Sequence, residues 1–294
     1  MSAPQEVTGE RLVPDRQHGE LVHAEHMARY VLTAQLAHGR RALDAACGEG
    51  YGTELLRRAG AERAVGIDVD EVTVRAARER YGAEFEVAAV ERLPFGDAAF
   101  DLIASFETIE HVEDAEAAVR EFRRVLAPDG TLVISTPNAS QYLVDNEFHV
   151  RELETSEFVE LLERHFAEVR VLHQQNWLAS AILAPDDLRE ATCERELELE
   201  VRKVAGAEPG RELYAVALCG AQACASLRQV AVMSGIHEAH ELARRLREAE
   251  RTAERWHTAF KETEGHLRWV VGTWSWKLTR PFRMPGRLRR RRGG

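Results

Sequence analysis

The residues best suited to chemistry begin with a glycine-rich segment, LDAACGEGYG, which runs from Leu43 to Gly52. Glycines allow the backbone to approach a bound ligand closely. A dinucleotide loop runs G-x-G-x-x-G and directs a helix N-terminus at pyrophosphate, but here the third glycine comes one position early and Asp44 precedes the loop. An acid at this place repels phosphate and attracts an ammonium group. The segment therefore predicts a small ligand that carries a positive charge.

A second acid, Asp68, ends the segment GID twenty residues beyond Gly48. A carboxylate at the end of this strand can accept hydrogen bonds from both hydroxyls of a ribose. An acid for an ammonium and an acid for a ribose together describe S-adenosylmethionine. We also place Ala45, Val69 and Ser105 at this cofactor. The alternative is a nucleotide-dependent oxidoreductase, but no lysine of the chain has the tyrosine four residues earlier that a short-chain reductase needs.

The segment Glu107-Thr-Ile-Glu110-His111 offers the groups for catalysis. Transfer of a methyl group from a sulfonium is an in-line displacement that needs an aligned acceptor and, for a hydroxyl, removal of a proton. Histidine titrates near neutral pH, so His111 is the first candidate for the general base, with Glu107 beside it. His149 lies in the irregular segment that follows and ranks second. The alternative is that the Glu-His pair only caps and packs a helix.

Alternating strand and helix patterns must position these groups. Apolar runs predict strands over 41–47, 63–69, 85–89, 100–106, 131–136, 167–174 and 212–219. Amphipathic patterns predict helices over 20–38, 51–60, 71–82, 115–126 and 156–166, the last with Ser156 as its N-cap. We expect the first helix to place Arg29 and Tyr30 near the cofactor. This alternation predicts an α/β fold, a doubly wound and mostly parallel sheet with helices on both faces.

Five segments, LDAACGEGYG, GIDVD, ERLPFGDAAFDLIASFETIEHV, RVLAPDG and ISTPN, resemble the motifs of class I S-adenosylmethionine-dependent methyltransferases of the ubiquinone-biosynthesis type. The resemblance covers roughly residues 40–175. It implies a Rossmann-like sheet of seven strands that ends in an antiparallel hairpin. It also implies cofactor contacts in three places: glycines 48, 50 and 52 around the methionine and ribose, Asp68 on the ribose, and Ala89 with Val90 beside the adenine.

The same resemblance bears on metal binding and on one departure from the family. Relatives with the spacing E-x-x-E-H hold a divalent cation through two acids and a histidine, which are Glu107, Glu110 and His111 in this sequence. Many relatives also carry an acid at the position of Ala89. The adenine amine is therefore expected to depend on backbone contacts here.

A different pattern follows Gly220, after which no further strand is predicted. We divide the chain into a methyltransferase domain over 1–220, a helical extension over 221–268 and a basic, tryptophan-rich tail over 269–294. Within 239–260 apolar or small residues recur at alternating spacings of three and four: Leu242, Leu246, Ala249, Ala253, Trp256 and Phe260. This heptad seam predicts a helix that pairs with a second copy or a partner chain. Its alternative is a helix folded back on the enzyme body.

The tail combines Trp269, Trp274 and Trp276 with eight basic residues after position 276. Tryptophan and clustered cations favour peripheral contact with an anionic membrane surface. Residues 274–283 also resemble a short element beside bacterial glycosyltransferases and methyltransferases of cell-surface polysaccharide assembly. That resemblance implies a saccharide acceptor. The alternatives are a solvated tail and contact with RNA.

Composition limits the remaining function classes. The formal charge of −10 and the acidic body before the tail argue against a nucleic-acid partner. No cysteine pair has C-x-x-C spacing, and no apolar run is long enough to span a membrane, so we expect a cytoplasmic protein that contacts the inner face of the membrane through its tail. The sequence predicts methyl transfer to a hydroxyl or amine of a saccharide or other small acceptor. A quinone or small aromatic acceptor and a catalytically silent cofactor-binding subunit are the alternatives.

Overall fold

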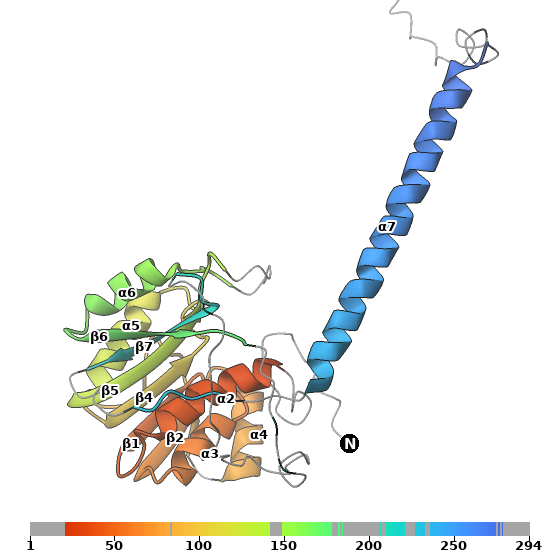
Figure 1. The fold of residues 1–294 in the computed structure, drawn as a ribbon. Helices are drawn as coiled ribbons and strands as arrows, with labels where there is room; N and C mark the ends of the chain where they lie inside the picture. Colours follow the sequence, from red (N-terminus) through yellow and green to blue (C-terminus); the bar gives the residue numbers. More distant parts are fainter. Residues whose placement is uncertain are drawn as a thin grey trace, which may run out of the picture. The chain divides into compact units, whose positions relative to one another are not determined.

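Figure 1 shows the computed structural model of the chain. It describes residues 21–82, 84–141, 149–177, 182, 184, 206, 210–220, 227–232, 236–274, 276 and 278. The chain divides into two compact units, residues 1–234 and 235–294. The first unit contains a seven-stranded sheet with its helices, and the second contains one long helix.

The sheet of the first unit has the strand order β3-β2-β1-β4-β5-β7-β6. Strands β1 to β5 are parallel, and β7 runs antiparallel to both of its neighbours, β5 and β6. The sheet is therefore the predicted doubly wound one with an antiparallel hairpin at its end. The strands are β1 (Arg41–Ala45), β2 (Arg63–Asp68), β3 (Phe85–Val87), β4 (Phe100–Phe106), β5 (Leu126–Pro137), β6 (Val169–Gln174) and β7 (Tyr214–Cys219).

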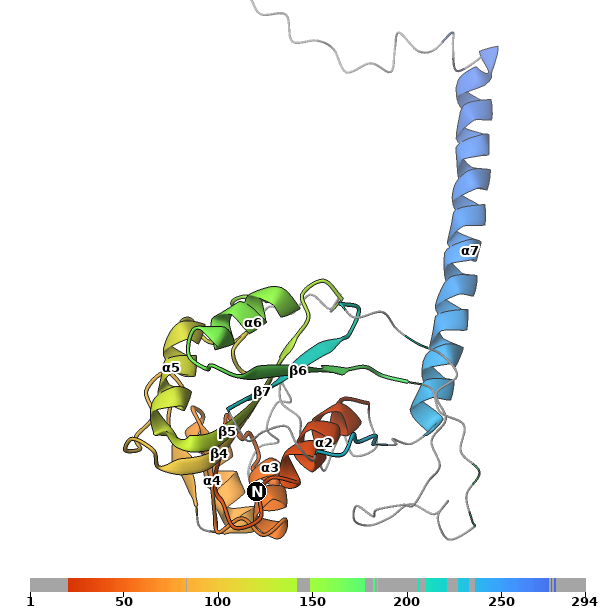
Figure 2. The same ribbon diagram turned by 60° about the vertical axis from the view of Figure 1, so that its left-hand side comes forward.

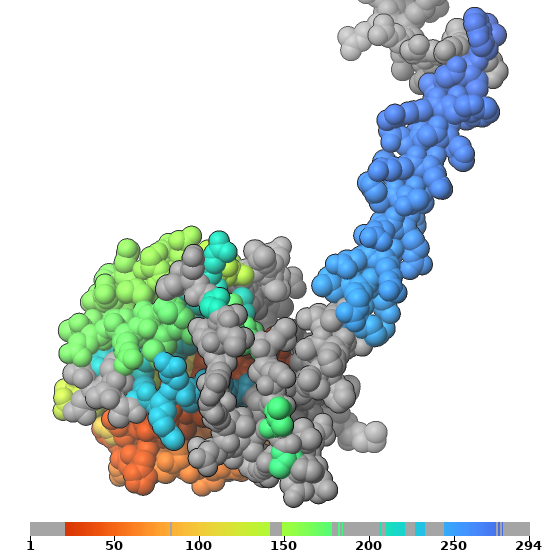
Figure 3. Space-filling view, in the orientation of Figure 1, coloured from red at the N-terminus to blue at the C-terminus, as the bar shows by residue number. Residues whose placement is uncertain are grey.

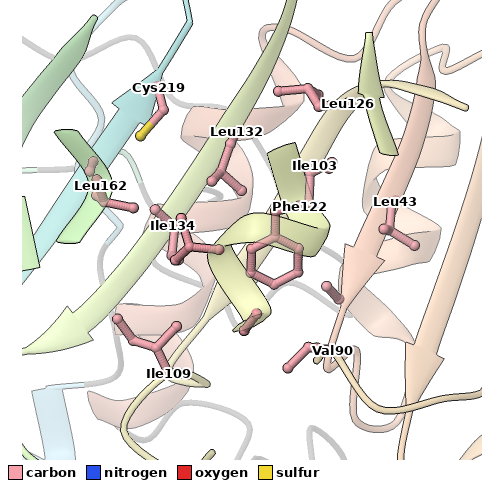
Figure 4. Close-up of a cluster of buried hydrophobic side chains, with 14 of the residues drawn as sticks. Leu43, Val90, Ile103, Ile109, Phe122, Leu126, Leu132, Ile134, Leu162 and Cys219 are labelled. Carbon is pink, nitrogen blue, oxygen red and sulfur yellow. The ribbon is translucent and has the colours of Figure 1, made fainter. Parts of the chain in front are cut away.

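Helices cover both faces of this sheet, and Figure 2 shows α5 and α6 on the opposite side from α2 and α3. The helices are α2 (Leu21–Ala34), α3 (Tyr51–Arg58), α4 (Glu71–Tyr81), α5 (Ala115–Val125) and α6 (Thr155–Glu163). Successive strand residues enter opposite layers, because side chains alternate across a strand. Leu43 and Ile103 pack with Phe122 of α5 in one core cluster (Figure 4), whereas Ala42 and Leu102 pack in a second cluster.

The start of α6 corrects one sequence prediction. Ser156 was expected as the N-cap, but the helix begins at Thr155 and Glu154 is the N-cap residue. The side chain of Glu154 accepts a hydrogen bond from the backbone of Glu157, and Glu157 Oε2 accepts one from the Glu154 backbone at 3.1 Å. This reciprocal capping box satisfies two helix-end donors at once, and a search for serine as the cap overlooked it.

The second unit is built on α7 (Ile236–Gly272), a helix of 37 residues. It extends beyond the predicted range of 239–260 and continues past residue 269, where we expected the tail to begin. Residues 279–294, which carry most of the basic run, lie outside the described part of the chain. Among the helices that the structure describes, none is both long and apolar enough to cross a membrane.

Candidate active site

The carboxyl ends of β1 and β4, which are neighbours in the sheet but not in the sequence, form the centre of the candidate site. This is where the strand order reverses, and open sheets bind their ligands at such a point. Ala46 after β1 has φ of 62° and Glu107 after β4 has φ of 49°. Residues other than glycine rarely adopt this conformation, which costs on the order of 1–3 kcal/mol and occurs mainly at functional sites. The strained backbone after β1 and after β4 is therefore typical of a ligand site.

Asp44 at the end of β1 is a buried carboxylate with 1% of its surface exposed. Tyr30 donates a hydrogen bond to Oδ1 at 2.9 Å, and Thr53 donates one to Oδ2 at 2.8 Å. Burial raises the pKa of Asp44 to about 6, although the two hydroxyl donors act in the opposite direction. Both hydroxyl donors are neutral, so the attraction of the carboxylate for a cation remains available to a ligand. This arrangement suits the ammonium group that the sequence predicts here.

Asp68 at the end of β2 is held in one orientation by backbone donors. The Gly48 N–H binds Oδ2 at 3.0 Å, and the Asp70 N–H binds Oδ1 at 3.0 Å. The next residue, Val69, is 65% exposed, and Ala89 in the segment after β3 is exposed as well. An oriented carboxylate beside exposed apolar groups suits a ribose and its base. Val90 instead packs in the core.

The three glycines of the loop have different surroundings. Gly48 has φ of +53°, and a Cβ atom there would meet nothing within 4 Å, so this glycine borders open space. A Cβ on Gly50 would lie 2.6 Å from the Phe85 ring, and one on Gly52 would lie 2.0 Å from the Tyr30 ring. Gly50 and Gly52 are therefore required by packing. Two further predicted cofactor residues, Ala45 and Ser105, are also fully buried.

On the side of β4, the structure groups Glu110, His111 and His149, whose possible ligand atoms lie within 4.8 Å of one another. Backbone pairing explains this grouping, because the N–H of Val150 donates to the Glu110 carbonyl at 2.8 Å. The rings of His111 and His149 are 4.9 Å apart, and Glu152 Oε1 lies 2.8 Å from His149 Nδ1. The fold thus brings together the two histidines that the sequence analysis ranked separately.

Glu110 is the most deeply buried member of this group, with 0% exposure. Thr136 donates to its Oε2 at 3.3 Å, whereas its Oε1 has no hydrogen-bond partner within the described residues. Burial, followed by the charge of Glu107, raises the pKa of Glu110 well above its usual range. A buried carboxylate oxygen without a partner is costly unless a proton, a cation or a ligand donor satisfies it.

Glu107 does not belong to this group. Its Oε1 accepts hydrogen bonds from Arg29 Nη1 at 2.8 Å and from Ser135 Oγ at 2.6 Å. Arg29 is 2% exposed and its guanidinium lies 4.6 Å from the centre of the Tyr214 ring. Its Nε and Nη2 have no hydrogen-bond partner in the part of the chain that is described. Sequence reasoning placed Arg29 near the cofactor but missed its ion pair with Glu107, for which no local spacing gives a signal.

Comparison with known proteins gives this geometry a family context. A family model described as a methyltransferase domain matches residues 43–134, from the middle of β1 into β5. The chain contains a methyltransferase domain. This domain has the class I fold, and the family uses S-adenosylmethionine, in agreement with the sequence prediction.

Individual relatives are similar to this chain over more residues than the family model matches. A probable S-adenosylmethionine-dependent methyltransferase of Mycolicibacterium smegmatis is 38% identical over 169 residues, which are 55% of this chain and 65% of that protein. A ubiquinone biosynthesis O-methyltransferase of Neisseria meningitidis is 36% identical over 107 residues, or 34% of this chain and 45% of that one. The chain thus spans less than two thirds of either relative.

Structural similarity to known proteins covers more of the chain than sequence similarity does. The crystal structure of an S-adenosylmethionine-dependent methyltransferase from Thermotoga maritima has a TM-score of 0.51 and 22% identity. It covers 72% of this chain and 96% of that protein. The neighbour supports the fold of the methyltransferase domain.

The first prediction concerns the ribose-binding carboxylate. Asp68→Ala should raise the dissociation constant for S-adenosylmethionine by about 10- to 100-fold, because a charge-assisted hydrogen bond contributes about 1.5–3 kcal/mol. Calorimetric titration measures this change. Asp97→Ala, which removes a carboxylate that is 82% exposed, is the matched control and should leave affinity unchanged. An unchanged affinity in Asp68→Ala, with a native thermal melt, would contradict the assignment.

The second prediction follows from the pKa of Asp44, which is about 6. The carboxylate is charged above this pH and neutral below it, whereas the ligand ammonium keeps its charge. Affinity for S-adenosylhomocysteine should therefore fall about tenfold between pH 7 and pH 5, as expected when only the ionised form binds. Asp44→Asn should bind weakly and without this pH dependence. A wild-type affinity that is constant over the same range would show that Asp44 does not hold the ammonium.

Proposed function

We propose that the protein transfers the methyl group of S-adenosylmethionine to a hydroxyl of a small acceptor. The observation that carries this proposal is the grouping of His111, His149 and Glu110 after β4, beside the strand that holds Asp44. The O-methyltransferase relative favours a hydroxyl acceptor over an amine. Because the chain spans only part of its relatives, the activity of the whole protein belongs to the proposal.

In this reaction the acceptor oxygen attacks the methyl carbon, and the bond from that carbon to sulfur breaks with its electron pair on sulfur. The hydroxyl proton moves to an imidazole nitrogen, for which His111 is the first candidate and His149 the second. Glu107, placed among the catalytic candidates, is neutralised by Arg29 and has a positioning role on the acceptor side. Alignment within a water-poor site supplies the rest of the rate enhancement.

The same group fits a divalent cation, with a ligand set that differs from the one expected. Two imidazoles and a carboxylate suit a borderline metal, and the Glu110 Oε1 atom without a partner is the feature that a cation would satisfy. A bound cation would act as a Lewis acid and lower the pKa of the acceptor hydroxyl. The cation set proposed from the structure is Glu110, His111 and His149.

A saccharide is the acceptor class that we propose, with a role in cell-surface polysaccharide or related biosynthesis. The support is the resemblance of residues 274–283 to an element of polysaccharide-assembly enzymes. A quinone or small aromatic acceptor is the second candidate, favoured by the name of the Neisseria relative. A silent cofactor-binding subunit is the third.

The third prediction tests the catalytic group. His111→Gln should lower turnover by about 100- to 10,000-fold with little change in cofactor affinity, because base catalysis contributes that factor. Turnover is measured by mass spectrometry of methylated products on a panel of sugars and catechols. His38→Gln, in the exposed turn before β1, is the control.

Removal of divalent ions separates the two roles of the histidines. Loss of wild-type activity after chelation, with recovery on adding one cation, would support the metal, and unchanged activity would exclude it in favour of a base. Equal losses of turnover and cofactor affinity in His111→Gln would make the residue structural. Cofactor binding without turnover on any acceptor would support the silent subunit.

We also propose that the tail contacts an anionic membrane surface. The fourth prediction is that replacing Arg289 to Arg292 by serine weakens sedimentation with phosphatidylglycerol vesicles at least about tenfold, because each cation near an anionic leaflet contributes about 1 kcal/mol. The matched control replaces four arginines of α7: Arg244, Arg245, Arg247 and Arg251. Equal binding by both variants would contradict the tail as the contact.

A further inference from the structure

The heptad seam continues along α7 beyond the range that the sequence analysis gave. After Phe260 the same alternation of three and four reaches Thr263, Leu267 and Val270 within the helix. Large apolar side chains on this seam are exposed, Leu246 by 60%, Trp256 by 73%, Phe260 by 67% and Leu267 by 59%. Figure 3 shows the side chains of α7 projecting from a single helix. A long helix gains most of its stability from burying such a face. The exposed seam therefore indicates that α7 packs against a partner.

The period of the seam selects the type of partner. A repeat of 3.5 residues stays aligned only with another helix that has the same repeat, because the two supercoil around each other. A membrane-surface helix instead has a wide apolar face and a polar face rich in cations. The outer surface of α7 mixes both signs and contains ion pairs such as Arg244–Glu248 at 2.8 Å and Arg268–Glu264 at 2.6 Å. These features fit a solvated coiled coil.

We propose that α7 pairs in antiparallel orientation with α7 of a second copy of this chain. The seam alternates between two heptad positions, a and d. In an antiparallel pair each a residue faces a d residue of the partner helix. One register places Trp256 opposite Ala253 of the second copy, Phe260 opposite Ala249 and Leu246 opposite Thr263. In each of these three layers a larger side chain faces a smaller one, whereas Leu242 faces Leu267 in a further layer, and the symmetry of the pair repeats each layer. Layers of nearly constant volume keep two helices at a constant distance.

Other arrangements lack this match of volumes. A parallel pair places Trp256 against Trp256 and Phe260 against Phe260, while Ala249 and Ala253 face their own copies across voids. If the antiparallel register shifts by one heptad in one direction, Trp256 faces Phe260. If it shifts by one heptad in the opposite direction, Ala249 faces Ala253. Overpacked layers and cavities are both destabilising, by about 1–5 kcal/mol each.

Charges beside the seam favour the same register. In the proposed pair Glu250 lies beside His257 of the second copy, an acid beside a basic residue, whereas Arg245 lies beside His266 and adds no attraction. The two shifted registers place Glu250 beside its own copy or beside Glu264. Like charges across a coiled coil are unfavourable, so both core volume and flanking charge select one register.

Cysteine pairs in the full-length chain test the orientation. Leu246→Cys and Thr263→Cys are made separately and co-expressed, and disulfide formation is followed on non-reducing gels. Position 246 should cross-link to position 263 of the other variant, and neither variant should cross-link to itself. In the antiparallel pair two copies of position 246 are about 25 Å apart along the axis, at about 1.5 Å per residue, which no disulfide can span. The unsubstituted chain controls for its native cysteines.

Volume exchange tests the layers. Ala253→Trp places two tryptophans in one layer and should raise the dimer dissociation constant at least tenfold in sedimentation equilibrium. The double variant Ala253→Trp with Trp256→Ala exchanges the large and small partners and should restore pairing. Thr258→Glu, on the face away from the seam, is the control and should leave the dimer intact. A monomeric full-length chain, or self-cross-linking of either single cysteine variant, would overturn the proposal.

Discussion

The buried carboxylate of Asp44 ties three elements of the first unit together. Tyr30 from α2 and Thr53 from α3 each donate a hydrogen bond to it, and Asp44 itself ends β1. A charge in this position is costly without its donors, so the helices must stay where their hydroxyls reach it. The Tyr30 ring also occupies the space next to Gly52, which makes glycine necessary there. The glycine loop therefore packs directly against α2.

The same helix connects the cofactor side of the site with the acceptor side. Tyr30 binds Asp44, and the preceding residue, Arg29, binds Glu107 after β4. One turn earlier, Glu25 accepts a hydrogen bond from Tyr214 Oη at 2.9 Å in β7. Consecutive turns of α2 thus contact the ends of β1, β4 and β7. Movement of α2 would therefore alter the surroundings of Asp44 and Glu107 together.

The two units have different requirements for stability. The sheet buries its apolar residues between its own helix layers, so it has a complete core. The described part of the second unit is a helix with exposed tryptophan, phenylalanine and leucine along one seam, and none of its described residues belongs to a core cluster. The candidate cofactor and catalytic residues lie in the first unit, and the second unit carries the seam for which we propose pairing. A dimeric helix would bring two tails to one assembly and so strengthen their contact with a surface.

Local pattern in the sequence determined the strands, the helices and S-adenosylmethionine as the cofactor. Glycine spacing, Asp44 and Asp68 are close in sequence, and a parallel crossover brings consecutive strand ends to one edge, so their chemistry could be predicted. Even there, the packing roles of Gly50 and Gly52 depend on Phe85 and Tyr30, which lie more than twenty residues away in the sequence. On the acceptor side the sequence indicated the candidate residues, but only the tertiary structure decided which of them contact one another. Arg29 and Glu107 are 78 residues apart, and His149 joins Glu110 through pairing between two loops. Such contacts arise from how whole elements pack, and the spacing of residue types along the chain carries no record of them.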